Sequence, residues 1–126
     1  MQSNATPGPA SPAGSPLDRL RHLPAEAQAS FTRFTTQGDL DALDPVILAI
    51  LQDYIPRQPA KPLAEHPGHT LLMEDLGFDS LAITEVIFFT EELLNISISN
   101  EEILQVRTLD DLRAFVRRKV TERLAA

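Results

Sequence analysis

Four prolines lie between residues 56 and 69, in the stretch PRQPAKPLAEHPGH, and they set the main constraint on how this chain folds. Proline lacks a backbone N–H, and its ring clashes with the preceding helical turn, so a regular helix does not continue through such a segment. We therefore expect residues 56–69 to form a loop between two helical regions. Pro56 ends the helix before this loop, and Pro45 suits the first position of that helix.

Apolar residues on both sides of the loop recur at helical spacing, and strand alternation of any length is absent. Asp44 is the predicted N-cap of the helix before the loop. The helix after the loop runs from Leu81 to about Leu94. Two further helices are predicted from a Ser or Thr that is followed three residues later by an acid, the signature of a capping box; these pairs are Ser99 with Glu102 and Thr108 with Asp111.

Together these patterns predict an all-α domain over residues 39–124, with three longer helices and one short one. The apolar stripe of its first helix is Ile47, Ile50, Leu51 and Tyr54. The stripe of its last helix is Leu109, Leu112, Phe115, Val116 and Val120.

The 38 residues before this domain divide into two segments. Residues 1–16 are mostly Ala, Pro, Gly and Ser, which bury too little apolar surface to offset the entropy of ordering, so we expect this tail to be disordered. Residues 17–38 form an extension in which Ala27, Phe31 and Phe34 lie at helical spacing. We expect a short helix there, packed on the domain near its first helix.

Acidic residues concentrate in one part of the chain, whose net charge is −7. Residues 70–106 contain eight acids and no Lys or Arg, whereas residues 107–126 contain six basic and three acidic residues. The acidic stretch repels phosphate backbones and attracts basic protein surfaces, which argues against nucleic-acid binding. No apolar run reaches the ~18 residues of a membrane span, and the N-terminus lacks the features of a secretory signal, so we expect a cytoplasmic protein.

The chain contains no cysteine, so it has no thiol of its own for disulfides or covalent chemistry. His66 and His69 lie near Glu65, but the intervening Pro-Gly gives no regular ligand spacing. We therefore predict no metal site.

The stretch EDLGFDSLAI, residues 74–83, places a single serine, Ser80, where the helix after the loop begins. In the simplest interpretation, Ser80 or Asp79 is an ordinary helix cap. A catalytic serine needs an adjacent base and an oxyanion site, and the histidines of the chain are His22, His66 and His69, two of them in the proline-rich loop. In a third interpretation the serine is modified, because a phosphoryl group at a helix N-terminus meets unpaired N–H groups and the positive end of the helix dipole.

The helix that follows Ser80 has an unusual outer face. Its predicted core side consists of Ile83, Val86, Ile87, Thr90 and Leu94. On the opposite side Leu81 and Phe88 alternate with Glu85 and Glu92, and Phe89 lies at the border. Apolar residues interleaved with carboxylates are typical of a surface that docks a partner. The alternative is that a second layer, such as the helix around Phe31, covers them.

The motif EDLGFDSL closely resembles the phosphopantetheine attachment motif of acyl carrier proteins, in which Asp-Ser-Leu follows a Leu-Gly turn. The resemblance covers about residues 40–122 and includes the acidic helix, ISNEEI and VRTLDDL. It implies a four-helix bundle of acyl-carrier type. It also implies that Ser80 carries 4′-phosphopantetheine and that Asp79 and Leu81 contact the phosphopantetheinyl transferase that installs it.

The resemblance further implies a freestanding, monomeric carrier that is not itself an enzyme. Such a carrier presents acyl thioesters to acyl-transferring, ketosynthase or ligase-type enzymes with basic docking surfaces, in fatty-acid, polyketide or specialised lipid biosynthesis. The residues implied in partner binding are Glu85, Phe88, Glu91, Glu92 and Glu101. Two alternatives remain open, namely a peptidyl or aminoacyl carrier and an unmodified interaction module with the same fold.

Overall fold

A computed structural model of the chain describes residues 20–125. The predicted disordered tail, residues 1–16, lies outside this part. The helices are α2 (Ala25–Gln37), α3 (Leu43–Tyr54), α4 (Ser80–Leu94), α5 (Asn100–Ile103) and α6 (Leu109–Ala125), with short 3-10 turns at Leu40–Ala42 and Leu63–Glu65. The β-structure of the described residues is one isolated bridge between Leu71 and Thr108. The predicted all-α fold is therefore confirmed.

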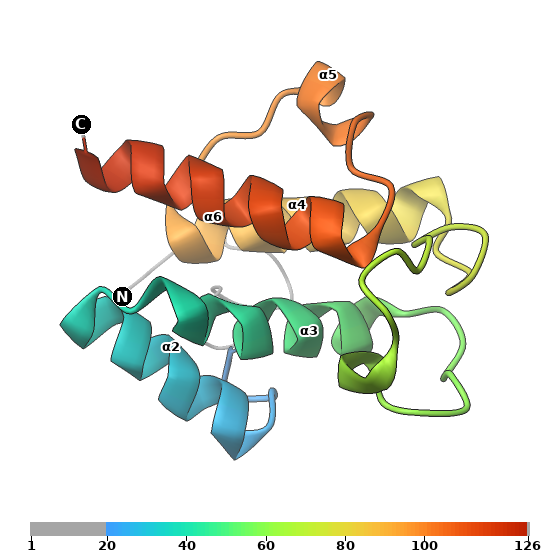
Figure 1. The fold of residues 1–126 in the computed structure, drawn as a ribbon, viewed down its shortest axis with the longest axis horizontal. Helices are drawn as coiled ribbons and strands as arrows, with labels where there is room; N and C mark the ends of the chain where they lie inside the picture. The colour runs from blue at the N-terminus through green and yellow to red at the C-terminus, as the bar shows by residue number, and fades with distance from the viewer. Residues whose placement is uncertain (1–19, 126) are drawn as a thin grey trace, which may run out of the picture.

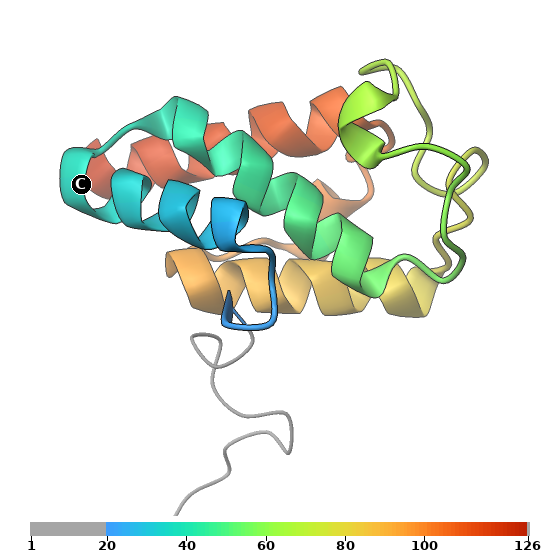
Figure 2. The ribbon, with the colours of Figure 1, turned by 90° about the horizontal axis from the view of Figure 1, so that it is seen from below.

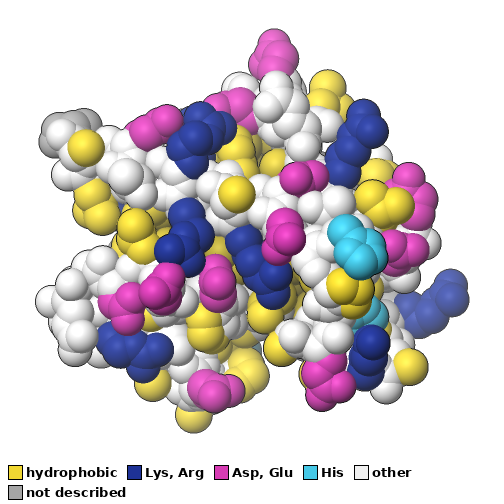
Figure 3. All heavy atoms as spheres, in the orientation of Figure 1, with side chains coloured by type: hydrophobic (Ala, Val, Ile, Leu, Met, Phe, Trp, Pro, Cys, Tyr) yellow, Lys and Arg dark blue, Asp and Glu magenta, His cyan; other side chains and the backbone are white. Residues whose placement is uncertain are grey.

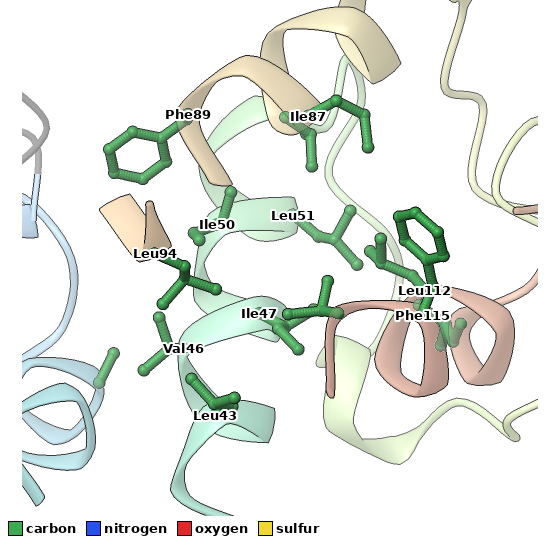
Figure 4. Close-up of a cluster of buried hydrophobic side chains, with 14 of the residues drawn as sticks. Leu43, Val46, Ile47, Ile50, Leu51, Ile87, Phe89, Leu94, Leu112 and Phe115 are labelled. Atoms are coloured by element: carbon green, nitrogen blue, oxygen red, sulfur yellow. The ribbon is translucent and has the colours of Figure 1, made fainter. Parts of the chain in front are cut away.

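The bundle is built around α3, which packs against α2, α4 and α6 (Figures 1 and 2). The short α5 lies on the opposite side of the molecule from α2 (Figure 1). Apolar stripes of α3, α4 and α6 meet in the core, as Figure 4 shows. Buried side chains there include Leu43, Val46, Ile47, Ile50 and Leu51 of α3, Ile87, Phe89 and Leu94 of α4, and Leu112 and Phe115 of α6.

The helix predicted in the extension is α2, and it packs against α3, as expected. Its buried residues include Ala27 and Phe34, and the ring of Phe34 lies 6.4 Å from that of the half-buried Phe31. Gly38 ends the helix with a φ of 70° while donating its N–H to the Phe34 carbonyl at 2.9 Å. This left-handed conformation favours glycine, which explains the stop.

The predicted start of α3 is wrong. A 3-10 turn capped by Asp39 runs directly into the helix, so Ala42 is already helical and α3 begins at Leu43. Asp44 therefore lies inside the first turn, where its carboxylate is 3.7 Å from the Arg117 guanidinium of α6. The same guanidinium donates to Asp41 at 2.8 Å, so acidic residues near the start of α3 bind α6.

The proline-rich segment is mostly loop, as predicted, but it also contains the 3-10 turn Leu63–Glu65, in which Leu63 is buried. On the face of the molecule in Figure 3, basic and acidic side chains lie interleaved. No helix within residues 20–125 is both long and apolar enough to cross a membrane.

Packing of α2 on α3 predicts a clear cost for removing its central aromatic ring. Phe34 is 5% exposed, so Phe34→Ala should destabilise the protein by about 3–5 kcal/mol, measured by chemical denaturation. Gln37→Ala, at an exposed position of the same helix, should change stability by less than about 0.5 kcal/mol.

Truncation tests the same packing. Deleting residues 1–16 should leave the melting temperature unchanged, and deleting residues 1–37 should lower it. Equal melting temperatures for the full chain and for residues 38–126 would contradict the packing.

Candidate functional site

The loop that leads to Ser80, residues 70–79, is closed by its own backbone hydrogen bonds. The Leu71 carbonyl accepts from Asp75 and Leu76 N–H, each at 3.1 Å, and the Leu72 carbonyl accepts from Phe78 N–H at 3.0 Å. The Asp75 carboxylate accepts from Leu71 N–H at 2.8 Å. The side chains of Leu72, Leu76 and Phe78 are buried. The glycine of the motif, Gly77, has a φ of 80°, which glycine adopts without a steric penalty.

Two backbone hydrogen bonds join this motif loop to the segment before α6. The Leu72 N–H donates to the Arg107 carbonyl at 2.9 Å, and the Leu109 N–H donates to the Thr70 carbonyl at 3.1 Å. They flank the isolated bridge between Leu71 and Thr108. These inter-loop hydrogen bonds fix the start of α4 relative to the start of α6.

Asp79 is the N-cap of α4, and its carboxylate accepts from Ala82 N–H at 2.8 Å. Ser80 is the first helical residue; it is exposed, and its hydroxyl has no hydrogen-bond partner among the described residues. Of the two predicted cap candidates, the structure thus assigns the cap to Asp79. The Ser80 hydroxyl remains available for chemistry at the surface.

A cleft of about 530 Å³ opens beside Ser80, between α4 and the α5 region. Its apolar lining comes from Met73, Ile83, Ile103, Leu104 and Val106. Its polar lining comes from Glu74, Ser80, Thr84, Asn100 and Arg107. Among residues 20–125, no histidine lines this cleft.

The outer face of α4 is open. Leu81 is 69% exposed and Phe88 is 67% exposed, and Glu85 and Glu92 are exposed beside them. The helix around Phe31, α2, does not cover these side chains, because it packs on α3 instead. Phe89 at the border is buried, with its ring 6.2 Å from that of Tyr54.

The core side of α4 agrees with the prediction at Val86, Ile87, Thr90 and Leu94, which are all buried. Ile83 differs, because it is only half-buried and its side chain lines the cleft.

The two other acids expected to bind partners have different surroundings. Glu91 is half-buried, and its carboxylate accepts from Ile98 N–H at 2.8 Å, so it holds the segment that follows α4. Glu101 is exposed on α5.

Glu102 holds α5 in place. It completes the predicted capping box with Ser99, accepting from the Ser99 N–H at 2.9 Å, and it also pairs with Lys119 of α6 at 3.2 Å. These interactions lower the pKa of the Glu102 carboxyl, first through the Ser99 N–H and then through Lys119.

No local sequence pattern predicts the cleft. Arg107 and Leu104 are far from Ser80 in sequence, and the inter-loop hydrogen bonds join their segment to the motif loop. Leu104 is an apolar residue just after the short helix α5, and the structure leaves it 75% exposed beside the cleft.

Comparison with known families identifies the chain. Residues 46–116 match a family described as the phosphopantetheine attachment site, and this chain belongs to that family. The matched residues run from α3 to α6 and include the motif loop, Ser80 and the cleft.

Several acyl carrier proteins are similar to the chain. One from Solidesulfovibrio magneticus is 38% identical over 50 residues, which cover 40% of this chain and 64% of that protein. One from an Exiguobacterium species is 27% identical over 74 residues, covering 59% of this chain and 94% of that protein. The anthracycline acyl carrier protein DpsG of Streptomyces peucetius is 35% identical over 51 residues, or 40% of this chain and 61% of that protein. The chain spans just under two thirds of the first and the last of these relatives.

In acyl carrier proteins, the domain of this family is the part to which 4′-phosphopantetheine is attached. Acyl carrier proteins are carriers and not catalysts. The residues present fit such a group, because Ser80 offers an exposed, unpartnered hydroxyl in the first turn of a 15-residue helix. The N–H groups and dipole of that turn favour the negative charge of a phosphodiester. Within residues 20–125, no group of three or more His, Cys, Asp or Glu is placed to hold a metal.

The lowered pKa of Glu102 predicts a pH-dependent share of stability. A carboxyl with a depressed pKa in the folded state stabilises fully above its unfolded pKa, and this share is lost as the pH falls through the folded value. Glu102→Gln keeps the capping group but loses the charge. The gap in melting temperature between wild type and Glu102→Gln should therefore shrink as the pH falls from 7 to below the ordinary glutamate pKa of ~4.3.

Glu101→Gln is the matched control for this measurement, because Glu101 is its exposed neighbour on the same helix. Its gap from wild type should stay nearly constant with pH. A constant gap for Glu102→Gln as well would show that its charge does not hold α5.

Proposed function

We propose that Ser80 is the attachment point of 4′-phosphopantetheine and that the chain carries acyl intermediates to partner enzymes of fatty-acid, polyketide or specialised lipid biosynthesis. The observation that carries this proposal is the exposed, unpartnered hydroxyl of Ser80, held at the start of α4 beside the cleft. Family membership and the names of the similar proteins support it.

The chemistry of the chain agrees with a carrier role. It has no cysteine, so a thiol must come from a prosthetic group. When bound, 4′-phosphopantetheine supplies that thiol, on which acyl groups are held as thioesters. The chain's own residues hold the attachment point: Asp79 caps the helix, and the buried Phe78 and Leu76 anchor the loop before it.

We propose residues 39–124 as the carrier domain and residues 17–38 as an added extension. The family match to residues 46–116 supports the first part. The extension contributes Leu23 and Phe34 to the same hydrophobic core, so it adds to the domain rather than forming a separate unit.

We propose the outer face of α4 as the docking surface for partner enzymes, including the phosphopantetheinyl transferase. Its two exposed apolar side chains, Leu81 and Phe88, offer contact area, and Glu85 and Glu92 attract a basic surface. Asp79 and Leu81 lie next to Ser80, where the transferase would contact them. Glu101, exposed on α5, extends the acidic surface, whereas the tie of Glu91 to Ile98 gives it a structural role as well.

Modification should depend on Ser80 alone. After incubation with coenzyme A and a broad-specificity phosphopantetheinyl transferase, intact mass spectrometry should show one added phosphopantetheine on the wild type and none on Ser80→Ala. The variant should still fold, because Asp79 and not Ser80 caps α4. Ser97→Ala, at another exposed serine, should be modified like the wild type.

The other outcomes separate the alternatives. A wild type that gains no mass would favour an unmodified interaction module. A loaded protein that accepts aminoacyl but not acyl groups would favour a peptidyl or aminoacyl carrier. Modification of Ser80→Ala at another serine would contradict the site.

Docking through the outer face of α4 should depend on its charge. Changing Glu85 and Glu92 together to Lys should slow modification by the transferase while leaving the helical circular dichroism unchanged. The effect should weaken at high salt, because exposed charges are screened over about 8 Å at physiological ionic strength. The matched control is the double change of Glu26 and Glu65 to Lys, which alters net charge equally at exposed positions on other elements.

Phe88→Ala tests the apolar part of this face. It should slow modification with little loss of stability, because the ring is 67% exposed. A rate equal to wild type for both Phe88→Ala and the double Lys variant at low salt would reject the outer face of α4 as the docking surface.

A further inference from the structure

Arg107 lines the cleft beside Ser80, and neither the fold nor the proposed docking surface explains its positive charge there. We propose that the guanidinium of Arg107 pairs with the phosphodiester through which the prosthetic group is joined to Ser80, and so positions the arm over the cleft. The inference rests on the proposed attachment at Ser80. Arg107 would be a positioning residue, since it contacts the linkage and not the reacting thiol.

Charge makes Arg107 distinctive. Residues 70–106 contain no Lys or Arg, and among the described residues that line the cleft Arg107 is the one cation. Ser80 lines the same cleft. A phosphodiester formed on its hydroxyl would therefore place a full negative charge at a cleft that holds a single guanidinium. Guanidinium groups form strong, directional hydrogen bonds with phosphate oxygens.

The side chain of Arg107 is not engaged elsewhere. Four cations of α6 have partners: Arg113 pairs with Asp110, Arg117 with Asp41, Arg118 with Glu122, and Lys119 with Glu102. The Arg107 guanidinium forms no hydrogen bond or ion pair among residues 20–125, although its charge adds a small attraction to Asp111. It is exposed and can reach toward an anion without first breaking an ion pair.

The backbone of Arg107, in contrast, is fixed. Its carbonyl accepts from Leu72 N–H of the motif loop at 2.9 Å, and its N–H donates to the Asp111 carboxylate at 3.1 Å. The base of the side chain is thus tied to the loop that positions Ser80. Such anchoring lowers the entropy lost when the guanidinium pairs with a fixed anion.

One opposing charge faces the same cleft. Glu74 also lines it but forms no ion pair with Arg107 among the described residues. A carboxylate there disfavours the entry of a second, free anion into the cleft, whereas the phosphodiester would be kept beside Ser80 by its covalent bond. For this reason we assign the anion to the linkage and not to a carboxylate at the far end of an acyl cargo.

The test uses the full chain labelled with ¹⁵N, before and after loading by the transferase, with intact mass confirming the loaded state. On loading, the Arg107 Nε–Hε signal should shift and its hydrogen exchange should slow roughly 1.5- to 5-fold, the range expected for an exposed ion pair. The effect should fade as salt is raised. The ³¹P signal of the phosphodiester should change in Arg107→Gln and be largely restored in Arg107→Lys.

Arg123→Gln is the control, because Arg123 is an exposed cation near the end of α6 and outside the cleft. The ³¹P signal of the phosphodiester in loaded Arg123→Gln should equal that in the loaded wild type.

An unchanged Arg107 signal in a chain that intact mass shows to be loaded would overturn the pairing while leaving the proposed function intact. A signal that responds to a malonyl but not an acetyl cargo, and not to loading itself, would overturn it in favour of cargo recognition. Failure to load Ser80 at all would reject the proposed function, and the pairing with it.

Discussion

Backbone hydrogen bonds between segments that are far apart in sequence hold the functional end of this protein together. Leu72 N–H donates to the Arg107 carbonyl, and Leu109 N–H donates to the Thr70 carbonyl, at 2.9 and 3.1 Å. They connect the loop that precedes α4 to the segment that precedes α6. Ser80 directly follows the first of these segments, Arg107 lies on the second, and residues of both line the cleft. The relative placement of Ser80 and Arg107 therefore depends on this connection.

The resulting arrangement separates rigid from adaptable parts. Capping by Asp79 and burial of Phe78 fix the start of α4, so an attached arm would swing from a defined point. A flexible arm on a fixed point raises the effective concentration of its cargo near a docked enzyme. The exposed Phe88, flanked by acids, suits weak and rapidly reversible contacts with basic partners.

Local patterns in the sequence predicted the elements whose signals are local. The capping box of Ser99 and Glu102 was predicted correctly, since both partners lie within one turn. Asp44 was misassigned as a cap because a 3-10 turn before α3 moves the helix start, and the Arg117 that binds Asp44 comes from the far end of the chain. The cleft could not be predicted, because it forms only where Arg107 and its neighbours meet the motif loop.

Amide hydrogen exchange followed by NMR on the full chain tests the role of the inter-loop hydrogen bonds most directly. If these bonds hold the motif loop in place, the amides of Leu72 and Leu109 should exchange about as slowly as that of Val86 in the buried part of α4. Exchange as fast as that of the exposed loop residue Gln58 would contradict the account, because the loop that carries Ser80 would then not be fixed to the rest of the bundle.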